Sequence, residues 1–181
     1  AQVHLVLGNH DGNLTNSSRL DAVSPIVDAI NSSNIKLYKQ SGVYQFEPGF
    51  NWCVFSLFDE SNWDKVKPVA NEYNIACYHG PVFGAKSETD WEVHDGLNVE
   101  FFEAFDLAFL GDIHRTQHLG FRDVSISKNR NDIKINPGDE VVELGNDEVL
   151  VKTRRPWISY PGSTIQQNYA ESLEHGFLLW D

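Results

Sequence analysis

The chain has 181 residues, of which 41% are apolar and 12% aromatic, so it is long enough to bury a core as one domain. No apolar run approaches the roughly 18 residues that a membrane-spanning helix needs, which speaks against a membrane protein. The net charge of −12 speaks against a nonspecific polyanion binder, because such proteins usually carry a basic face.

The first predicted element is a strand at Val3–Leu7 that runs into the polar loop Gly8-Asn9-His10-Asp11. This arrangement places reactive side chains at the end of a buried strand, where open α/β sheets keep their sites. A helix is predicted to begin near Ser24-Pro25, with Ser24 as N-cap and Pro25 at the first helical position, and to end within residues 31–34.

Further strands and short helices are predicted along the rest of the chain. Further strands are predicted at Ile35–Lys39, Val43–Glu47, Trp52–Phe58, Asn74–Tyr78, Leu107–Leu110, Trp157–Tyr160 and Phe177–Trp180. Short helices are predicted at Ser61–Tyr73, where Pro68 limits the length, and at Glu100–Phe105.

Residues 120–156 carry the turn residues of β-hairpins and are interpreted as an inserted β element. They hold seven acidic and seven basic side chains, so the rest of the chain carries the whole net charge. The basic residues are Arg122, Lys128, Arg130, Lys134, Lys152, Arg154 and Arg155. These could line a nucleic-acid groove, but the equal number of acids favours a solvated hairpin surface.

Both cysteines, Cys53 and Cys77, lie inside apolar runs. Two such cysteines favour a reduced, cytoplasmic chain, with a lone disulfide as the alternative. No signal-peptide pattern precedes the first strand.

Three predicted strands end in loops that carry His, Asp or Asn, at residues 8–11, 79–80 and 111–114. Together these loops contain Asn9, His79, Asp112 and His114, a set of nitrogen and oxygen ligands without a thiolate. Such a set suits Mn, Fe, Zn or Mg rather than a structural cysteine-zinc site. Each residue alone could be structural; His79, for example, could be a strand-end histidine bonded to backbone.

His10 follows Asn9 directly, so the two side chains should diverge rather than bind the same ion. His10 is therefore interpreted as an acid that protonates a leaving oxygen or stabilises developing charge. Asp11 could orient His10, or its carboxylate could cap backbone N–H groups of the loop. The sequence leaves both roles of Asp11 open.

The three loops resemble, in order and spacing, the third, fourth and fifth motifs of calcineurin-like metallophosphoesterases: Gly8-Asn9-His10-Asp11, His79-Gly80 and Gly111-Asp112-Ile113-His114. Within that superfamily, residues 160–169 (Tyr-Pro-Gly-Ser-Thr-Ile-Gln-Gln-Asn-Tyr), Glu171 and Gly176-Phe177 resemble the end of the nuclease domain in SbcD-type DNA-repair exonucleases. The resemblance covers most of the chain except residues 120–156.

The resemblance implies a site for two divalent ions, usually manganese, with Mg, Fe or Zn as alternatives. Asn9, His79 and Asp112 would hold one ion and His114 the other, while His10 would be the catalytic acid with Asp11 beside it. The ions would activate a bridging water that attacks phosphorus. Candidate substrate contacts are Arg115, Ser163, Arg154 and Arg155.

Two departures from the family pattern stand out. The fifth motif usually begins Gly-His, whereas Asp112 stands here, and a carboxylate shifts the metal preference towards hard ions. The first two motifs of the family, Asp-x-His and Gly-Asp-x-x-Asp, would precede Val3 and are absent. In the family, these motifs supply the carboxylate that bridges both ions. We therefore expect an N-terminally truncated catalytic domain that is inactive or nearly so by itself.

The expected fold is a calcineurin-like α/β sandwich over residues 1–181 that lacks its first βα units and carries the 120–156 insert. The expected function of the parent protein is hydrolysis of DNA phosphodiesters in DNA repair or recombination, in the cytoplasm and away from membranes. The resemblance also implies an SbcC-like ATPase partner and leaves a homodimer open. One alternative is a metallophosphatase or phosphodiesterase for small esters, which the acidic charge favours mildly. The other is a non-catalytic binding module whose metal site has decayed.

Overall fold

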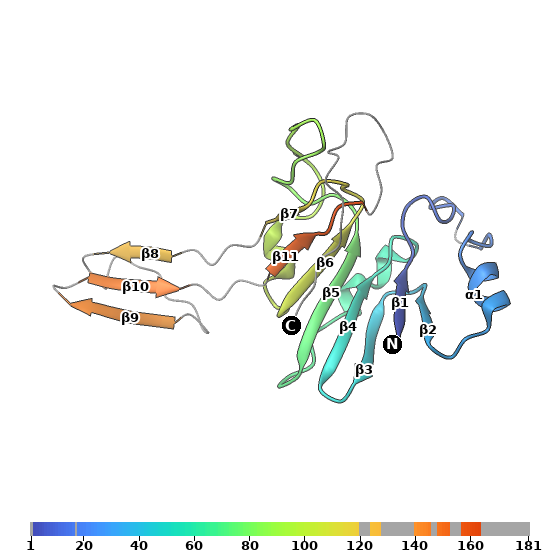
Figure 1. The fold of residues 1–181 in the computed structure, drawn as a ribbon, viewed down its shortest axis with the longest axis horizontal. Helices are drawn as coiled ribbons and strands as arrows, with labels where there is room; N and C mark the ends of the chain where they lie inside the picture. The colour runs from blue at the N-terminus through green and yellow to red at the C-terminus, as the bar shows by residue number, and fades with distance from the viewer. Residues whose placement is uncertain are drawn as a thin grey trace.

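A mixed six-stranded β-sheet is the centre of the fold (Figure 1). The computed structural model describes residues 2–16, 18–119, 124–127, 140–145, 148–152 and 157–163, with the backbone alone described in the three short ranges between 124 and 152. The strands of this sheet are, in spatial order, β3 (Gly42–Glu47), β4 (Phe50–Phe55), β5 (Tyr73–His79), β6 (Leu107–Gly111), β11 (Trp157–Tyr160) and β7 (Gln117–His118). The four central strands are parallel, and β3 and β7 are antiparallel edges.

A second, two-stranded parallel sheet lies beside the first, and a helix belongs to the connection between its strands. Its elements are β1 (Val3–Val6), α1 (Ser24–Ile30) and β2 (Ile35–Tyr38). Aromatic rings link the two sheets, because the ring of His4 lies 5.4 Å from Trp52, whose ring lies 6.0 Å from Phe109. The chain is thus an α/β protein with a mixed sheet and few helices.

Two details at the N-terminal end differ from the sequence prediction. The first strand is less buried than predicted, since Val3 is exposed and only Leu7, just beyond β1, is buried. Ser24 lies inside α1 and is not its N-cap. The Asp21 carboxylate takes the capping role and accepts hydrogen bonds from the backbone N–H groups of Val23 and Ser24, at 3.0 and 2.6 Å.

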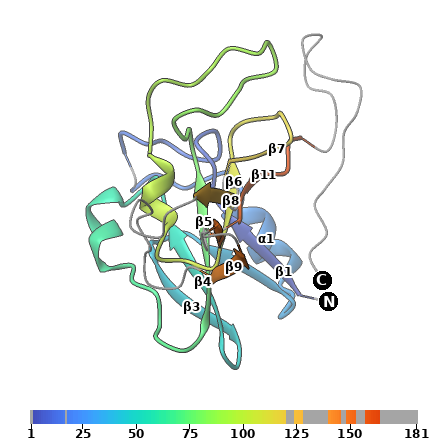
Figure 2. The ribbon, with the colours of Figure 1, turned by 90° about the vertical axis from the view of Figure 1, so that its left-hand side faces the viewer.

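The main hydrophobic core lies on the opposite face of the six-stranded sheet from the β1–β2 sheet. Alternate residues of the central strands point into it: Cys53, Phe55, Ala76, Tyr78, Ala108, Leu110, Ile158 and Tyr160. Phe102 and Phe105 close this core, and Trp63 packs at its border. Figure 2 shows the short helical turns on this side of the sheet and α1 on the other.

The two short helices predicted after β4 and β5 are only 3-10 turns, η1 (Glu60–Lys65) and η2 (Val99–Phe102). The first one ends at Lys65, well before the predicted Tyr73, because Pro68 disfavours helical backbone at the residue before it. The indole N–H of Trp63 also donates to the Ser56 carbonyl at 2.7 Å, which ties the turn to the end of β4.

The insert predicted at residues 120–156 is β-structure in its described part. It forms a three-stranded antiparallel sheet in the order β8 (Val124–Ser127), β10 (Glu148–Lys152) and β9 (Glu140–Gly145). Figure 1 draws this sheet apart from the central sheet. The basic side chains considered above for a nucleic-acid groove, Arg154 and Arg155 included, lie outside the described residues and side chains, as does the strand predicted at Phe177–Trp180.

Both cysteines are free thiols, and burial raises the pKa of each to about 12. The disulfide considered as an alternative is therefore wrong. Across the described ranges, no helix combines the length and the apolar character that crossing a bilayer requires.

Candidate metal centre

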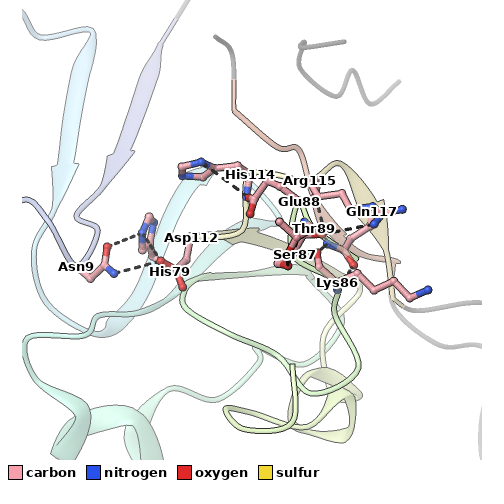
Figure 3. A network of polar contacts seen from close by, with 10 residues as sticks. All are labelled: Asn9, His79, Lys86, Ser87, Glu88, Thr89, Asp112, His114, Arg115 and Gln117. Carbon is pink, nitrogen blue, oxygen red and sulfur yellow. Dashed lines mark hydrogen bonds and ion pairs between the residues drawn. The ribbon is translucent and has the colours of Figure 1, made fainter. Parts of the chain in front are cut away.

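Three strand ends bring Asn9, His79 and Asp112 together, although they are as many as 103 residues apart in the chain (Figure 3). Asn9 follows β1, His79 is the last residue of β5 and Asp112 follows β6. The Oδ1 atom of Asn9 lies 3.2 Å from Nε2 of His79, and Nδ2 of Asn9 donates to Oδ1 of Asp112 at 3.1 Å. His79 Nε2 lies 3.8 Å from the same carboxylate oxygen. The predicted meeting of these three loops is confirmed.

These separations suit the first coordination sphere of one ion. Two donor atoms bound to the same Zn²⁺ or Mg²⁺ at about 2.1 Å lie roughly 3.0 to 3.4 Å apart. The observed 3.2 and 3.8 Å between the nitrogen of His79 and its two oxygen neighbours are close to that range. Within the described part of the chain, no three His, Cys, Asp or Glu side chains form a metal-binding group, and the third polar side chain of this cluster is the amide of Asn9.

Two glycines make the slot that holds the His79 ring. A Cβ atom at Gly8 would lie 2.7 Å from Cε1 of His79, and one at Gly111 would lie 2.5 Å from its Nδ1. Neither glycine has a positive φ, so the neighbouring imidazole, rather than the backbone conformation, requires the missing side chain. The glycines of the first and third loops thus leave the space that the histidine of the second loop occupies.

The charge state of His79 also suits a ligand. Burial lowers its pKa and outweighs the carboxylates of Asp112 and Asp11, which act in the opposite direction. The ring is therefore neutral around neutral pH, which is the form that binds a metal. His10 and His114 lie close enough to lower this pKa further, so all the predicted site residues around His79 belong to one electrostatic cluster.

One residue of the cluster has an unusual backbone conformation. Asp112 has a φ of 88°, a left-handed conformation that is rare for a residue other than glycine and is often found at functional sites. Asp11 closes the first loop, because its carboxylate accepts the N–H of Gly8 at 2.7 Å. Of the two roles that the sequence left open for Asp11, the structure shows the backbone cap.

His10, the predicted catalytic acid, is exposed to solvent on this loop. It is adjacent to the Asn9 ligand but is not part of the hydrogen-bonded set that joins Asn9, His79 and Asp112. An exposed histidine at the rim of the cluster is accessible to a substrate.

The loop that carries His114 rests on the Pro161-Gly162-Ser163 segment. The N–H of Ser163 donates to the His114 carbonyl at 3.1 Å, and the Thr116 hydroxyl donates to the Pro161 carbonyl at 2.8 Å. Gly162 has a φ of 79°, and a Cβ there would lie 2.7 Å from the His114 carbonyl oxygen. This segment therefore supports His114, and Ser163 is nearly buried rather than open to a substrate.

Arg115, the other described candidate for substrate contact, is already engaged. Its guanidinium pairs with the Asp90 carboxylate and lies 3.4 Å from the Ser87 carbonyl. Ser87 and Asp90 belong to a hairpin closed by the antiparallel bridge between Lys86 and Glu92, which sequence reasoning missed. The hairpin also contains Glu88, whose carboxylate accepts the backbone N–H of His114 at 3.0 Å. Its residues carry no periodic pattern, and only the folded chain brings them to His114.

Comparisons with known proteins leave the family open. No model of a known protein family matches the chain, and no solved structure matches it. The chain is similar to the uncharacterized protein R555 of Acanthamoeba polyphaga mimivirus, with 35% identity over 193 aligned residues. The alignment covers 99% of this chain but only 12% of the viral protein, whose name states no activity.

Proposed function

We propose that this chain is part of a calcineurin-like metallophosphoesterase sandwich and that its site hydrolyses DNA phosphodiesters, as in SbcD-type exonucleases. The observation that carries the proposal is the convergence of Asn9, His79 and Asp112 from three strand ends, with donor separations of 3.2 and 3.8 Å about His79. A single strand-end histidine is ordinary, but three neutral or acidic ligands in one half-buried cluster suit a divalent ion.

The residues of the chain would hold two ions, and different residues would bind each ion. Asn9, His79 and Asp112 would hold one divalent ion, for which manganese is the first choice, and His114 would contribute to a second. When bound, the ions supply charge neutralisation at phosphorus and a water of lowered pKa.

His10 would act from outside the ligand set. Its exposed imidazole at the rim can hold a proton near the leaving oxygen of a bound ester and donate it as the bond breaks. Asp11 keeps the loop closed by holding the Gly8 N–H, and this fixes where His10 stands relative to Asn9.

DNA is the proposed substrate because the Tyr160–Tyr169 segment resembles the nuclease branch of the superfamily. The net charge of −12 means that the ions, or a basic partner such as an SbcC-like ATPase, would have to attract the phosphates. The same charge would suit a small phosphoester, which is the second candidate.

The test is a hydrolysis assay on the natural protein that carries this sequence, with Mn²⁺ or with EDTA. Linear duplex DNA, bis-p-nitrophenyl phosphate and p-nitrophenyl phosphate are offered as separate substrates. We expect DNA cleavage that EDTA abolishes and that His10→Ala lowers by about 100-fold or more, the size typical of a lost general acid. His94→Ala is the matched control, since His94 is exposed and, among the described residues, its ring packs against the rings of Phe83 and Trp91.

Hydrolysis of the monoester alone would favour the small-ester candidate. Manganese binding without hydrolysis of any substrate would indicate a non-catalytic module. DNA cleavage that is unchanged in His10→Ala would remove His10 from the mechanism.

A further inference from the structure

A cavity of about 550 Å³ lies where the carboxyl ends of three strands meet, apart from the cluster of Asn9, His79 and Asp112. Among the residues that line it, Leu7 follows β1, Lys39 follows β2, and Phe58 lies just beyond β4. Open α/β sheets bind their ligands at the carboxyl ends of strands, and ligand pockets have volumes of about 300–1,000 Å³. The place and the size of this cavity therefore suit a small organic ligand.

One part of the cavity wall is apolar and aromatic. It consists of Leu7, which is buried, and of Leu37, Tyr44 and Phe58, which are half-buried. A Cβ atom at Gly12 would lie 2.7 Å from Cε1 of Phe58, so this ring rests directly against the backbone of the loop that carries the candidate ligands. A flat ring of a ligand can pack against such a wall.

The two acidic side chains of the wall already have partners within the chain. The Asp21 carboxylate pairs with Nζ of Lys39 at 2.7 Å and accepts the backbone N–H of Ser24 at 2.6 Å. The Asp59 carboxylate accepts the backbone N–H of Ser41 at 2.9 Å and also the Ser41 hydroxyl. Both carboxylates are thus used to hold the loops around the cavity.

The donor groups of the wall, in contrast, have hydrogen-bonding capacity left for a ligand. Arg19 is exposed, and its guanidinium forms no hydrogen bond or ion pair with the described residues. The ammonium group of Lys39 has three N–H donors, and its side chain stays 47% exposed beside Asp21. The amide oxygen of Asn13 accepts the N–H of Thr15, which leaves the amide NH2 group for a ligand. Two cations with unused donors favour an anionic ligand.

We propose that this cavity binds a nucleoside monophosphate, with the base against Leu37 and Phe58 and the phosphate on Arg19 and Lys39. A nucleotide combines a flat ring with a compact anion, and arginine is well suited to bind phosphate through two parallel hydrogen bonds. The inference rests on the proposed function only for the source of the nucleotide, which would be the end of a DNA strand. Binding of a free nucleotide requires neither hydrolysis nor a metal ion.

Arg19 is the residue whose replacement tests the phosphate contact most cleanly. Lys39 also pairs with the buried Asp21, so its loss would weaken the fold, whereas Arg19 is exposed. Arg19→Gln should therefore leave stability nearly unchanged. Lys36→Gln is the matched control, because Lys36 is an exposed cation of β2 that does not line the cavity.

The experiment follows the backbone amide resonances of the 181-residue chain by NMR in the presence of EDTA. Deoxyadenosine monophosphate, deoxyadenosine and inorganic phosphate are titrated separately. We expect the nucleotide to shift the amides of Gly12, Asn13 and Lys39 and to bind at least about 10-fold more tightly than either of its parts. Arg19→Gln should weaken nucleotide binding about 10-fold, the effect of one lost hydrogen bond to a charged group, and Lys36→Gln should leave it unchanged.

The inference is overturned if the nucleotide shifts none of these amides, if phosphate alone binds as tightly, or if Arg19→Gln binds like wild type. A further titration uses the tetranucleotide of deoxyadenosine. Tighter binding than that of the mononucleotide supports the end of a DNA strand as the ligand, and weaker binding supports a free nucleotide. If the natural protein hydrolyses no ester while this chain binds the mononucleotide as expected, the proposed function fails and the nucleotide site stands.

Discussion

At the scale of single residues, the cluster of Asn9, His79 and Asp112 depends on two neighbouring glycines as well as on its own side chains. The ring of His79 fits between Gly8 and Gly111 with no space for a methyl group at either position. In this position the Nε2 atom of His79 lies 3.2 Å from Oδ1 of Asn9 and 3.8 Å from Oδ1 of Asp112. Burial, which lowers its pKa, keeps the ring neutral.

Gly111→Ala should therefore displace the His79 ring and lower Mn²⁺ affinity by about 10-fold or more, the size typical of disturbed support around a metal ligand. The free energy of unfolding should fall by about 1–3 kcal/mol, since a buried methyl group must be accommodated. Calorimetric titration and thermal unfolding measure the two effects.

Gly84→Ala is the control for a general effect of adding a methyl group. Gly84 has a φ of 82° but open space around its Cα, so alanine there should cost about 1 kcal/mol of backbone strain and leave Mn²⁺ binding unchanged. Equal Mn²⁺ affinities in wild type and Gly111→Ala would show that the slot does not position His79.

At the scale of elements, Asp21 joins the start of α1 to the end of β2. Its buried carboxylate accepts N–H groups of Val23 and Ser24 and the Ser24 hydroxyl, and it pairs with Lys39 at 2.7 Å. Burial alone would raise its pKa, but the bonds from Lys39 and Ser24 outweigh burial and hold the pKa well below its usual range.

Asp21→Asn should lower the free energy of unfolding by about 2 kcal/mol at pH 7, because hydrogen bonds to a charged group are lost. A carboxylate with a lowered pKa in the folded chain stabilises it fully above the unfolded value of about 3.9, and this contribution is lost as the pH falls towards the folded value. The difference between wild type and Asp21→Asn should therefore shrink below about pH 4. Denaturant unfolding at several pH values measures it, and a constant difference would contradict the role of the charge.

The sequence predicted the elements whose pattern is local. An apolar run followed by a polar loop identified β1, β5 and β6, and their shared direction brought Asn9, His79 and Asp112 together. The prediction from sequence failed where a contact between residues far apart in the chain decides the local structure. The contact of Glu88 with the backbone N–H of His114, for example, joins loops 26 residues apart in the chain.

At the scale of the whole molecule, the candidate centre lies at the ends of strands from both sheets. Asn9 comes from the two-stranded sheet, while His79 and Asp112 come from the six-stranded one. The ring of His4 in the two-stranded sheet lies 5.4 Å from that of Trp52 in the six-stranded sheet, so aromatic packing joins the two sheets that carry the cluster. The cluster of Asn9, His79 and Asp112 thus depends on how the two sheets pack together.

The most direct test of the metal centre is a calorimetric titration of Mn²⁺ into this chain, its Asp112→Ala variant and a control, Asp28→Ala, which removes an exposed charge on α1. We expect wild type and the control to bind Mn²⁺ equally and Asp112→Ala to bind at least about 10-fold more weakly, because it loses the carboxylate ligand of the cluster. Absence of Mn²⁺ binding in wild type, or equal binding by all three proteins, would contradict a metal centre at Asn9, His79 and Asp112.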